Sequence, residues 1–192
     1  SAVEFATHSV DRLHTTAESH DRVMVIEVMG RDAGRIALHA GVGGGADAIL
    51  LPEIPYDLSL VAEKILERKA AGRHFSIVVV AEGAKAKDGK QHYETHGTAG
   101  VARLGGIGRH VAGQLGDLTG IESRYTVLGH LQRGGIPTGY DRVLATRLGA
   151  HAVELVERGE WNRLVVMKER HIGSIPLADA VGANRLVNTE CD

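Results

Sequence analysis

Residues 75–81 place the strongest constraint on the fold, because they form a short and almost wholly apolar run. Ile77 to Val80 are four β-branched residues in succession, and Glu82-Gly83 ends the run. β-branched residues favour strands, and a run of this length is too short for a buried helix. We therefore predict a central strand over residues 75–81 that is buried on both faces.

The rest of the chain alternates between short apolar runs and helical patterns. The apolar runs predict strands over residues 23–28, 48–51, 125–128 and 164–167. Apolar residues spaced by three and four predict helices at about residues 3–13, 34–42, 58–66, 100–119 and 138–155, with a polar loop over 85–97. Thr138, followed at three residues by Asp141, is a capping signal for the last helix. This alternation predicts an α/β fold, a Rossmann-like lobe with a parallel sheet and helices on both faces.

Composition excludes several classes of function. The chain is 43% hydrophobic and 24% charged, with a net charge of −2 at pH 7, so no bulk positive field attracts nucleic acid. No apolar run approaches the roughly 18 residues that a membrane span needs. Cys191 has no partner for a disulfide, which fits a reducing compartment. We expect a cytoplasmic protein, and the start at Ser1 without a leader suggests a piece of a longer chain.

Gly30 and Arg31 directly follow a predicted buried strand. Sites in parallel α/β sheets lie beyond the carboxyl ends of the strands. Backbone N–H groups at the glycine could approach an anion there while Arg31 supplies positive charge. A turn glycine followed by a solvated arginine fits the same residues.

Glu82 ends the most apolar strand. An unpaired carboxylate is costly in such surroundings, so a partner must share its hydrogen bonds. A sugar hydroxyl is one such partner, and a structural salt bridge to an arginine is the other.

His130 and Arg133 lie three residues apart between Gly129 and Gly134-Gly135. The arginine fork and the imidazole can converge on one phosphate, although a loop that only turns the chain into a helix would look the same. The sequence has no phosphate loop of the G-x-x-x-x-G-K-[ST] type and no zinc-ligand spacing, so no metal site is predicted. Residues 41–46 match G-x-G-x-x-A, but they follow a predicted helix and are interpreted as its end.

Three segments, residues 27–31, 79–83 and 126–135, together resemble the motif series of the 6-phosphofructokinase family in order and spacing. Shorter matches at residues 11–22, 45–47 and 52–53 extend this resemblance over nearly the whole chain. It implies a phosphofructokinase-like α/β lobe, the C-terminal half that binds fructose 6-phosphate. Residues 14–20 look closest to the group that has both ATP-using and pyrophosphate-using members.

The resemblance also implies roles for individual residues. Those that would hold the 6-phosphate of fructose 6-phosphate are Arg22, Arg124, His130 and Arg133. Those that would contact the sugar are Glu82 at its hydroxyls and Met29, Gly30 and Arg31 near the reacting 1-hydroxyl. Arg31 is the catalytic candidate, because it would also stabilise charge on the transferring phosphoryl group.

Three further residues correspond to positions of the family's effector pocket, namely His14, Asp47 and Arg73. His14 replaces a basic residue of the family, and Asp47 stands where Glu is usual. Effector control is therefore not implied by the resemblance.

The family's Gly-Gly-Asp-Gly donor motif and its Thr-Ile-Asp-Asn-Asp motif do not occur in this sequence. The expected cofactors are Mg²⁺ with ATP or pyrophosphate, bound mainly by an N-terminal half that the sequence does not contain. The expected enzyme is a 6-phosphofructokinase of glycolysis, with this chain inactive alone. The alternative is a non-catalytic regulatory subunit that binds a sugar phosphate.

The resemblance divides the chain into a sugar-phosphate-binding lobe over residues 1–133, a crossing segment over 134–167 and a return segment over 168–192. Arg22 and Arg124 precede the strands whose far ends carry the other site residues. Five or six strand residues span roughly 16–20 Å, more than an arginine side chain can reach. We therefore expect a homo-oligomer in which each pocket is shared between two subunits.

Overall fold

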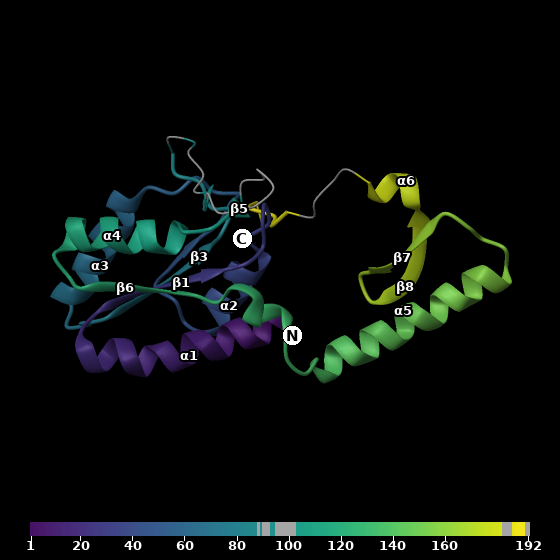
Figure 1. Cartoon of the computed structure of the whole chain (residues 1–192), viewed down its shortest axis with the longest axis horizontal. Helices are drawn as coiled ribbons and strands as arrows, with labels where there is room; N and C mark the ends of the chain where they lie inside the picture. Colours follow the sequence, from purple (N-terminus) through teal and green to yellow (C-terminus); the bar gives the residue numbers. More distant parts are fainter. Residues whose placement is uncertain (88, 90–92, 95–102, 182–185, 191–192) are drawn as a thin grey trace. The chain divides into compact units, whose positions relative to one another are not determined.

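The computed structural model describes residues 1–87, 89, 93–94, 103–181 and 186–190 (Figure 1). The described residues fall into two compact units. One contains residues 2–135 and 186–190, and the other contains Ser1 and residues 136–181. Every predicted site residue lies in the first unit.

The first unit is built on a parallel sheet of four strands in the order β2-β3-β1-β6. These strands are β1 (Val23–Val28), β2 (Ala48–Leu50), β3 (Ser76–Ala81) and β6 (Ser123–Val127). Residue 28 of β1 pairs with residue 81 of β3, and residue 27 pairs with residue 127 of β6. The carboxyl ends of these three strands therefore meet at one edge. The prediction of a central strand at residues 75–81 is confirmed, since all six residues of β3 are buried.

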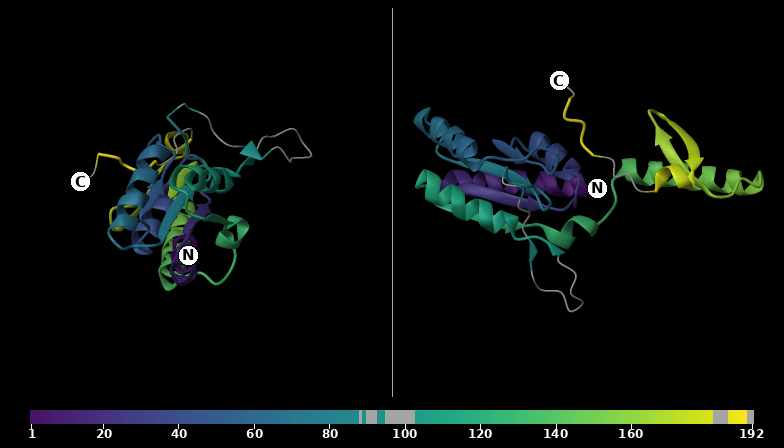
Figure 2. Two further views of the ribbon diagram at one scale, coloured as in Figure 1. Left: turned by 90° about the vertical axis from the view of Figure 1, so that its left-hand side faces the viewer. Right: turned by 90° about the horizontal axis from the view of Figure 1, so that it is seen from above.

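Helices cover both faces of the sheet, as predicted (Figures 1 and 2). On one face lie α1 (Ala2–His20) and α2 (Arg35–Gly43), packed on Ile26, Ile77 and Val79. On the other lie α3 (Leu58–Ala70) and α4 (Ile107–Thr119), packed on Val78 and Val80. Successive strand residues point to opposite faces, so one apolar run serves both layers of the core.

Two helix ends set the direction in which the chain enters β1 and β6. After α1, Asp21 adopts a left-handed conformation with φ of 51°, and the N–H of Arg22 donates to the carbonyl of Ala17 at 3.2 Å. After α4, Gly120 is left-handed with φ of 66°. Left-handed residues at the position after a helix end the helix and redirect the chain. Arg22 and the first residues of β6 thus begin at the same edge of the sheet.

The second unit contains α5 (Gly139–Glu157), the antiparallel strands β7 (Arg163–Lys168) and β8 (His171–Pro176), and α6 (Leu177–Ala180). Thr138 caps α5 as predicted, because its hydroxyl accepts from the N–H of Asp141 at 3.3 Å. Leu155 is the buried residue of α5, whereas Leu144 and Leu148 are half-buried. Large apolar side chains are exposed in this unit, among them Ile136, Tyr140, Val143, Val153, Val156, Trp161 and Val181.

The structure differs from the predicted elements at several places. The helix predicted over residues 100–119 begins at Ile107, and Arg103–Leu104 form a short strand, β5, that pairs with β4 (Tyr93–Glu94) within the predicted loop. Residues 100–102 lie outside the described part. Strand β8 and helix α6 were not predicted. None of the described helices combines the length and the apolar character of a membrane span.

Candidate functional site at the carboxyl edge of the sheet

The carboxyl edge brings together the three predicted strand ends. Met29, Gly30 and Arg31 follow β1, Glu82 follows β3, and the 3₁₀ turn η1 (Gly129–Arg133) follows β6. Because β1 lies between β3 and β6, the Gly30-Arg31 turn sits between the other two groups. These residues are about a hundred positions apart in the sequence, and the parallel pairing of the strands brings them close together in space.

Glu82 holds the turn after β1. Its Oε1 accepts hydrogen bonds from the N–H of Gly30 at 3.1 Å and from the N–H of Arg31 at 2.9 Å. The backbone N–H pair that we predicted to meet an external anion therefore already meets an internal carboxylate. The partner of Glu82 in this structure is this backbone pair, not the salt bridge to an arginine.

The turn also requires glycine at two places. Gly30 has φ of 155°, and a Cβ there would lie 2.4 Å from the carbonyl oxygen of Ala33. At Gly83 a Cβ would lie 1.8 Å from the carbonyl oxygen of Arg31. Arg31 itself is left-handed, with φ of 53°, which is unfavourable for a side chain of this size. The backbones of the two strand ends are thus in direct contact, and the contact fixes where Arg31 starts.

Gln132 joins the turn after β1 to the turn after β6. Its side-chain oxygen accepts from the N–H of Met29 at 3.3 Å, and its amide donates to the carbonyl of Gly129 at 3.2 Å. Gln132 is 3% exposed, so it makes both bonds from a buried position. Sequence reasoning missed this residue, although its position between the two basic residues of the motif was a signal.

The side chains of Arg31, His130 and Arg133 are exposed at this edge. Within the described ranges, none of the three side chains has a hydrogen bond or an ion pair. Two guanidinium groups and an imidazole with open donors form a site that can bind a phosphorylated ligand through charge-assisted hydrogen bonds.

Arg22 and Arg124 lie at the opposite, amino edge, where both contact Glu122. Nε of Arg22 donates to Glu122 Oε2 at 2.8 Å, and Nε of Arg124 donates to Oε1 at 2.9 Å. These bonds, that of Arg22 first, hold the pKa of Glu122 below its ordinary value. The structure therefore separates the eight predicted binding residues into a group of six and a pair.

Two of the effector candidates, His14 and Asp47, have partners of their own. Nε2 of His14 is 2.7 Å from the carbonyl oxygen of Gly44, and its ring packs edge-on against Phe75. Asp47 accepts from the N–H of Ile77 at 2.9 Å and pairs with Arg68 at 2.7 Å. Arg73 is exposed. The carboxylate of Asp47 thus ties α3 to the sheet.

Buried Glu27 explains the charged interruption of the β1 run. It is 3% exposed and faces the first turn of α4, where its carboxylate accepts from the N–H of Gly108 at 2.8 Å. A carboxylate at a helix N-terminus is stabilised by the unpaired N–H groups and the helix dipole. Glu27 therefore anchors α4 beside the carboxyl edge without taking part in the exposed site.

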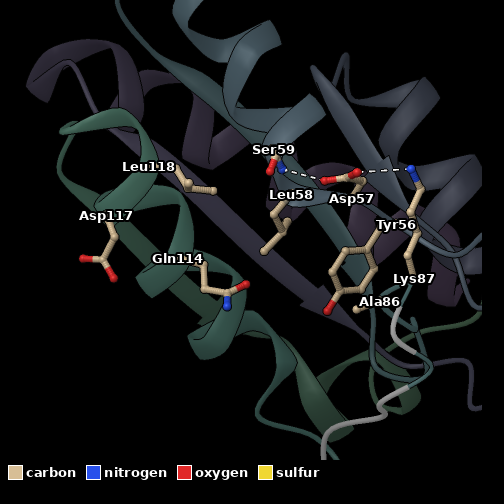
Figure 3. Close-up of a pocket in the computed structure, with 9 residues that line it drawn as sticks. All are labelled: Tyr56, Asp57, Leu58, Ser59, Ala86, Lys87, Gln114, Asp117 and Leu118. Carbon is tan, nitrogen blue, oxygen red and sulfur yellow. Dashed lines mark hydrogen bonds and ion pairs between the residues drawn. The ribbon is translucent and has the colours of Figure 1, made fainter.

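A separate pocket of about 490 Å³ opens between α3 and α4 (Figure 3). Tyr56, Leu58, Gln114 and Leu118 are among its lining residues, and none of the predicted site residues is. Asp57 on its rim accepts from the N–H of Ser59 at 3.0 Å as the N-cap of α3 and pairs with Lys87 at 3.1 Å.

The hydrogen bond from Lys87, followed by that from Ser59, lowers the pKa of the Asp57 carboxyl group in the folded protein. The ionised carboxylate should therefore stabilise the fold at pH values above the ordinary pKa of aspartate. We expect Asp57→Ala to lower the melting temperature by about 2–4 °C at pH 7, since a helix cap is lost. Asp57→Asn, which keeps the cap, should cost less. The difference in melting temperature between wild type and Asp57→Asn should vanish as the pH falls through the folded-state pKa of Asp57. Calorimetry that shows the same difference at pH 2 as at pH 7 would contradict the role of the charge.

No group of three or more His, Cys, Asp or Glu side chains placed to hold a metal ion occurs among the described residues. The residues of the carboxyl edge do not fit a magnesium site by themselves.

Proteins with a parallel α/β sheet bind ligands beyond the carboxyl ends of the strands. The exposed arginines at the carboxyl edge place this protein in that class. The sequence pattern of the Phosphofructokinase family matches residues 1–156, and the chain belongs to this family. It is 52% identical over 191 residues to the ATP-dependent 6-phosphofructokinase of Chloroflexus aurantiacus, covering 100% of this chain and 52% of that protein. It is 47% identical to ATP-dependent 6-phosphofructokinase 1 of Synechocystis, covering 98% and 52%. The chain thus spans about half the length of these curated relatives.

Solved structures agree with the assignment of the fold. Phosphofructokinase from Saccharomyces cerevisiae superimposes with a TM-score of 0.79 at 34% identity, covering 94% of this chain and 23% of that one. Pyrophosphate-dependent phosphofructokinase from Nitrosospira multiformis gives a TM-score of 0.82 at 23% identity, covering 98% and 48%. The second similarity supports the fold alone.

Proposed function

We propose that this chain supplies the fructose 6-phosphate site of a cytoplasmic, glycolytic 6-phosphofructokinase, which transfers a phosphoryl group to the 1-hydroxyl of the sugar. The observation that carries the proposal is the set of exposed side chains with open N–H donors, Arg31, His130 and Arg133, at one carboxyl edge. Membership of the phosphofructokinase family supports the choice of substrate and reaction.

In this proposal His130 and Arg133 bind the 6-phosphate, because they share a short turn and have open donors. Met29 and Gly30 line the sugar, and the second carboxylate oxygen of Glu82 accepts from a sugar hydroxyl while the first holds the turn. The left-handed turn aims Arg31 toward the reacting end of the sugar. Its guanidinium group would stabilise charge on the equatorial oxygens of the phosphoryl group during transfer.

We propose ATP as the phosphoryl donor, because relatives that are 47–53% identical over nearly the whole chain are named ATP-dependent. Mg²⁺ would accompany ATP and neutralise phosphate charge. Ligands for the donor and the metal ion would come from the half of those relatives that this chain does not match.

We further propose that each pocket is completed by Arg22 and Arg124 of a neighbouring subunit. The six residues of β1 separate the two edges by roughly 20 Å, so a chain cannot bring these arginines to its own His130 and Arg133. A two-fold contact between the amino edge of one sheet and the carboxyl edge of another would bring the arginines of one subunit to the pocket of its neighbour. The symmetry would complete both pockets of the pair in the same way.

Substitution of Arg133 tests the proposed sugar-phosphate site. In the full-length protein, Arg133→Gln is expected to raise KM for fructose 6-phosphate about tenfold or more, because one bidentate phosphate contact is lost. The measurement is initial rate against sugar-phosphate concentration at saturating ATP.

Lys64→Gln, which removes a positive charge from the exposed face of α3, is the matched control and should leave KM unchanged. Equal KM values for wild type and Arg133→Gln would refute the proposed role. Tight binding of fructose 6-phosphate without turnover by the full-length wild type would instead favour a non-catalytic regulatory subunit.

A further inference from the structure

Glu122 lies between the two arginines of the amino edge and contacts each with a different oxygen. Its Oε2 faces Nε of Arg22, and its Oε1 faces both Nε of Arg124 and a terminal nitrogen of Arg124 at 2.6 Å. Two guanidinium groups brought together would repel each other. The carboxylate between them offsets that repulsion and fixes where each group lies.

The backbone around Glu122 is built to make this contact. The N–H of Val23 donates to the carbonyl of Glu122 at 3.0 Å, which locks the start of β1 to the start of β6. In the same register Met24 pairs with Arg124, so Arg22 lies two residues before the level of Arg124, at the start of the adjacent strand. The left-handed turns at Asp21 and Gly120 deliver both strands to this edge. The strand pairing thus sets the positions of Arg22, Glu122 and Arg124, which do not depend on flexible surface loops.

The contact leaves both arginines able to bind a further anion. An arginine side chain has five N–H donors, of which the hydrogen bonds to Glu122 use one at Arg22 and one at Arg124, whose terminal nitrogen also forms an ion pair with the carboxylate. The side chain of Arg22 is 25% exposed and that of Arg124 is 62% exposed. With Glu122 ionised, the three groups together keep one positive charge. Glu122 is ionised at neutral pH, as an ordinary glutamate is, and the hydrogen bonds from Arg22 and then from Arg124 lower its pKa further.

We propose that Glu122 is a positioning residue, which holds Arg22 and Arg124 side by side as a single phosphate-binding pair for the pocket of a neighbouring subunit. The proposal rests on the proposed function for the identity of the phosphate, but not for the pairing of the arginines. Ordering two long side chains before the ligand arrives lowers the entropic cost of binding. Glu122 takes no part in phosphoryl transfer, so its effect should fall on binding of the sugar phosphate.

The kinetic test uses Glu122→Ala and Glu122→Gln in the full-length protein. Glu122→Ala is expected to raise KM for fructose 6-phosphate about tenfold while kcat stays within about twofold. Glu122→Gln keeps one acceptor oxygen and should fall between wild type and Glu122→Ala. The control is Glu63→Gln, which removes a negative charge from the exposed face of α3 and should change neither constant. An unchanged KM overturns the proposal, and a lower KM overturns it in favour of a carboxylate that competes with phosphate.

A second measurement does not depend on activity. The Nε–H signals of Arg22 and Arg124, assigned in ¹⁵N spectra, should both shift in Glu122→Ala. Inorganic phosphate should move both signals together in wild type, with at least severalfold weaker affinity in the variant. If full-length wild type shows no phosphorylation of fructose 6-phosphate, the proposed function fails, and the phosphate titration alone decides on Glu122. Independent movement of the two signals in wild type would overturn the pairing.

Discussion

Mixed oligomers of Arg124→Ala and Arg31→Ala subunits are expected to regain about a quarter of wild-type activity on fructose 6-phosphate, although each variant alone should be nearly inactive. The prediction concerns the full-length protein, and it follows from the opposite edges that the two arginines occupy. Arg31 follows β1 at the carboxyl edge, whereas Arg124 lies near the start of β6. If a pocket takes Arg31 from one subunit and Arg124 from another, a mixed pair contains one intact pocket and one doubly defective pocket. Random mixing makes half of all pairs mixed, which gives the expected fraction.

The matched control mixes Arg31→Ala with Arg133→Ala subunits. These two residues lie at the same carboxyl edge, so every chain would carry a defect in its own pocket and no recovery is expected. The measurement is initial rate after unfolding and refolding the mixture, with hybrid formation verified by differently tagged subunits. Failure of verified Arg124→Ala and Arg31→Ala hybrids to recover, or equal recovery in the control, would rule out the shared pocket.

Gly83→Ala is the second substitution with a large expected effect. The new Cβ would lie 1.8 Å from the carbonyl oxygen of Arg31, and the obstacle is backbone that no rotamer change can move away. We expect a loss of about 1–3 kcal/mol in the free energy of unfolding, the usual range for overpacking. The turn that aims Arg31 must also shift, so activity of the full-length protein should fall by about a hundredfold.

Gly113→Ala provides the comparison, because Gly113 lies in α4 and a Cβ added there would meet nothing outside its own helix within 4 Å. Alanine is favoured over glycine in a helix by roughly 1 kcal/mol, so this variant should be as stable as wild type or more stable. Denaturant unfolding and steady-state kinetics on both variants make the test. Equal stability of Gly83→Ala and wild type would show that the two strand ends are not in contact as described.

The strands of the central sheet could be predicted because their sequences are locally decisive. The β-branched run Ile77–Val80 excludes a helix by composition and length, and β1 is likewise apolar except at Glu27. The start of α4 could not be placed in this way, because Val101 and Leu104 continue the helical spacing of the residues that follow. Gly105 and Gly106, with φ of 153° and 76°, break the chain there. A pair of adjacent glycines was the local signal that the periodicity concealed.

The candidate site was predictable where it depends on strand ends, and not where it depends on pairing between distant segments. Arg31, Glu82 and Arg133 each follow an apolar run, so the carboxyl-edge rule brings them together. Nothing near Gln132 or Glu122 in the sequence specifies their distant partners, Met29 and Arg22, which lie 103 and 100 positions away. Such contacts are set by the order and register of the strands, and those emerge only from the folded chain.

The hydrogen bonds of Glu82 to the Gly30-Arg31 turn have a consequence for the kind of ligand that the edge accepts. Two adjacent backbone N–H groups make a natural cradle for an anion, and here a fixed negative charge of the protein fills that cradle. The carboxylate of Glu82 would repel a second anion at this position, whereas an uncharged hydroxyl could donate a hydrogen bond to the same carboxylate. The centre of the edge, where Glu82 holds the Gly30-Arg31 turn, therefore accepts uncharged groups, whereas the side chains of Arg31 and of Arg133 in the η1 turn carry positive charge. A molecule that is uncharged in its middle and carries anionic groups at its ends matches this division better than a compact polyanion does.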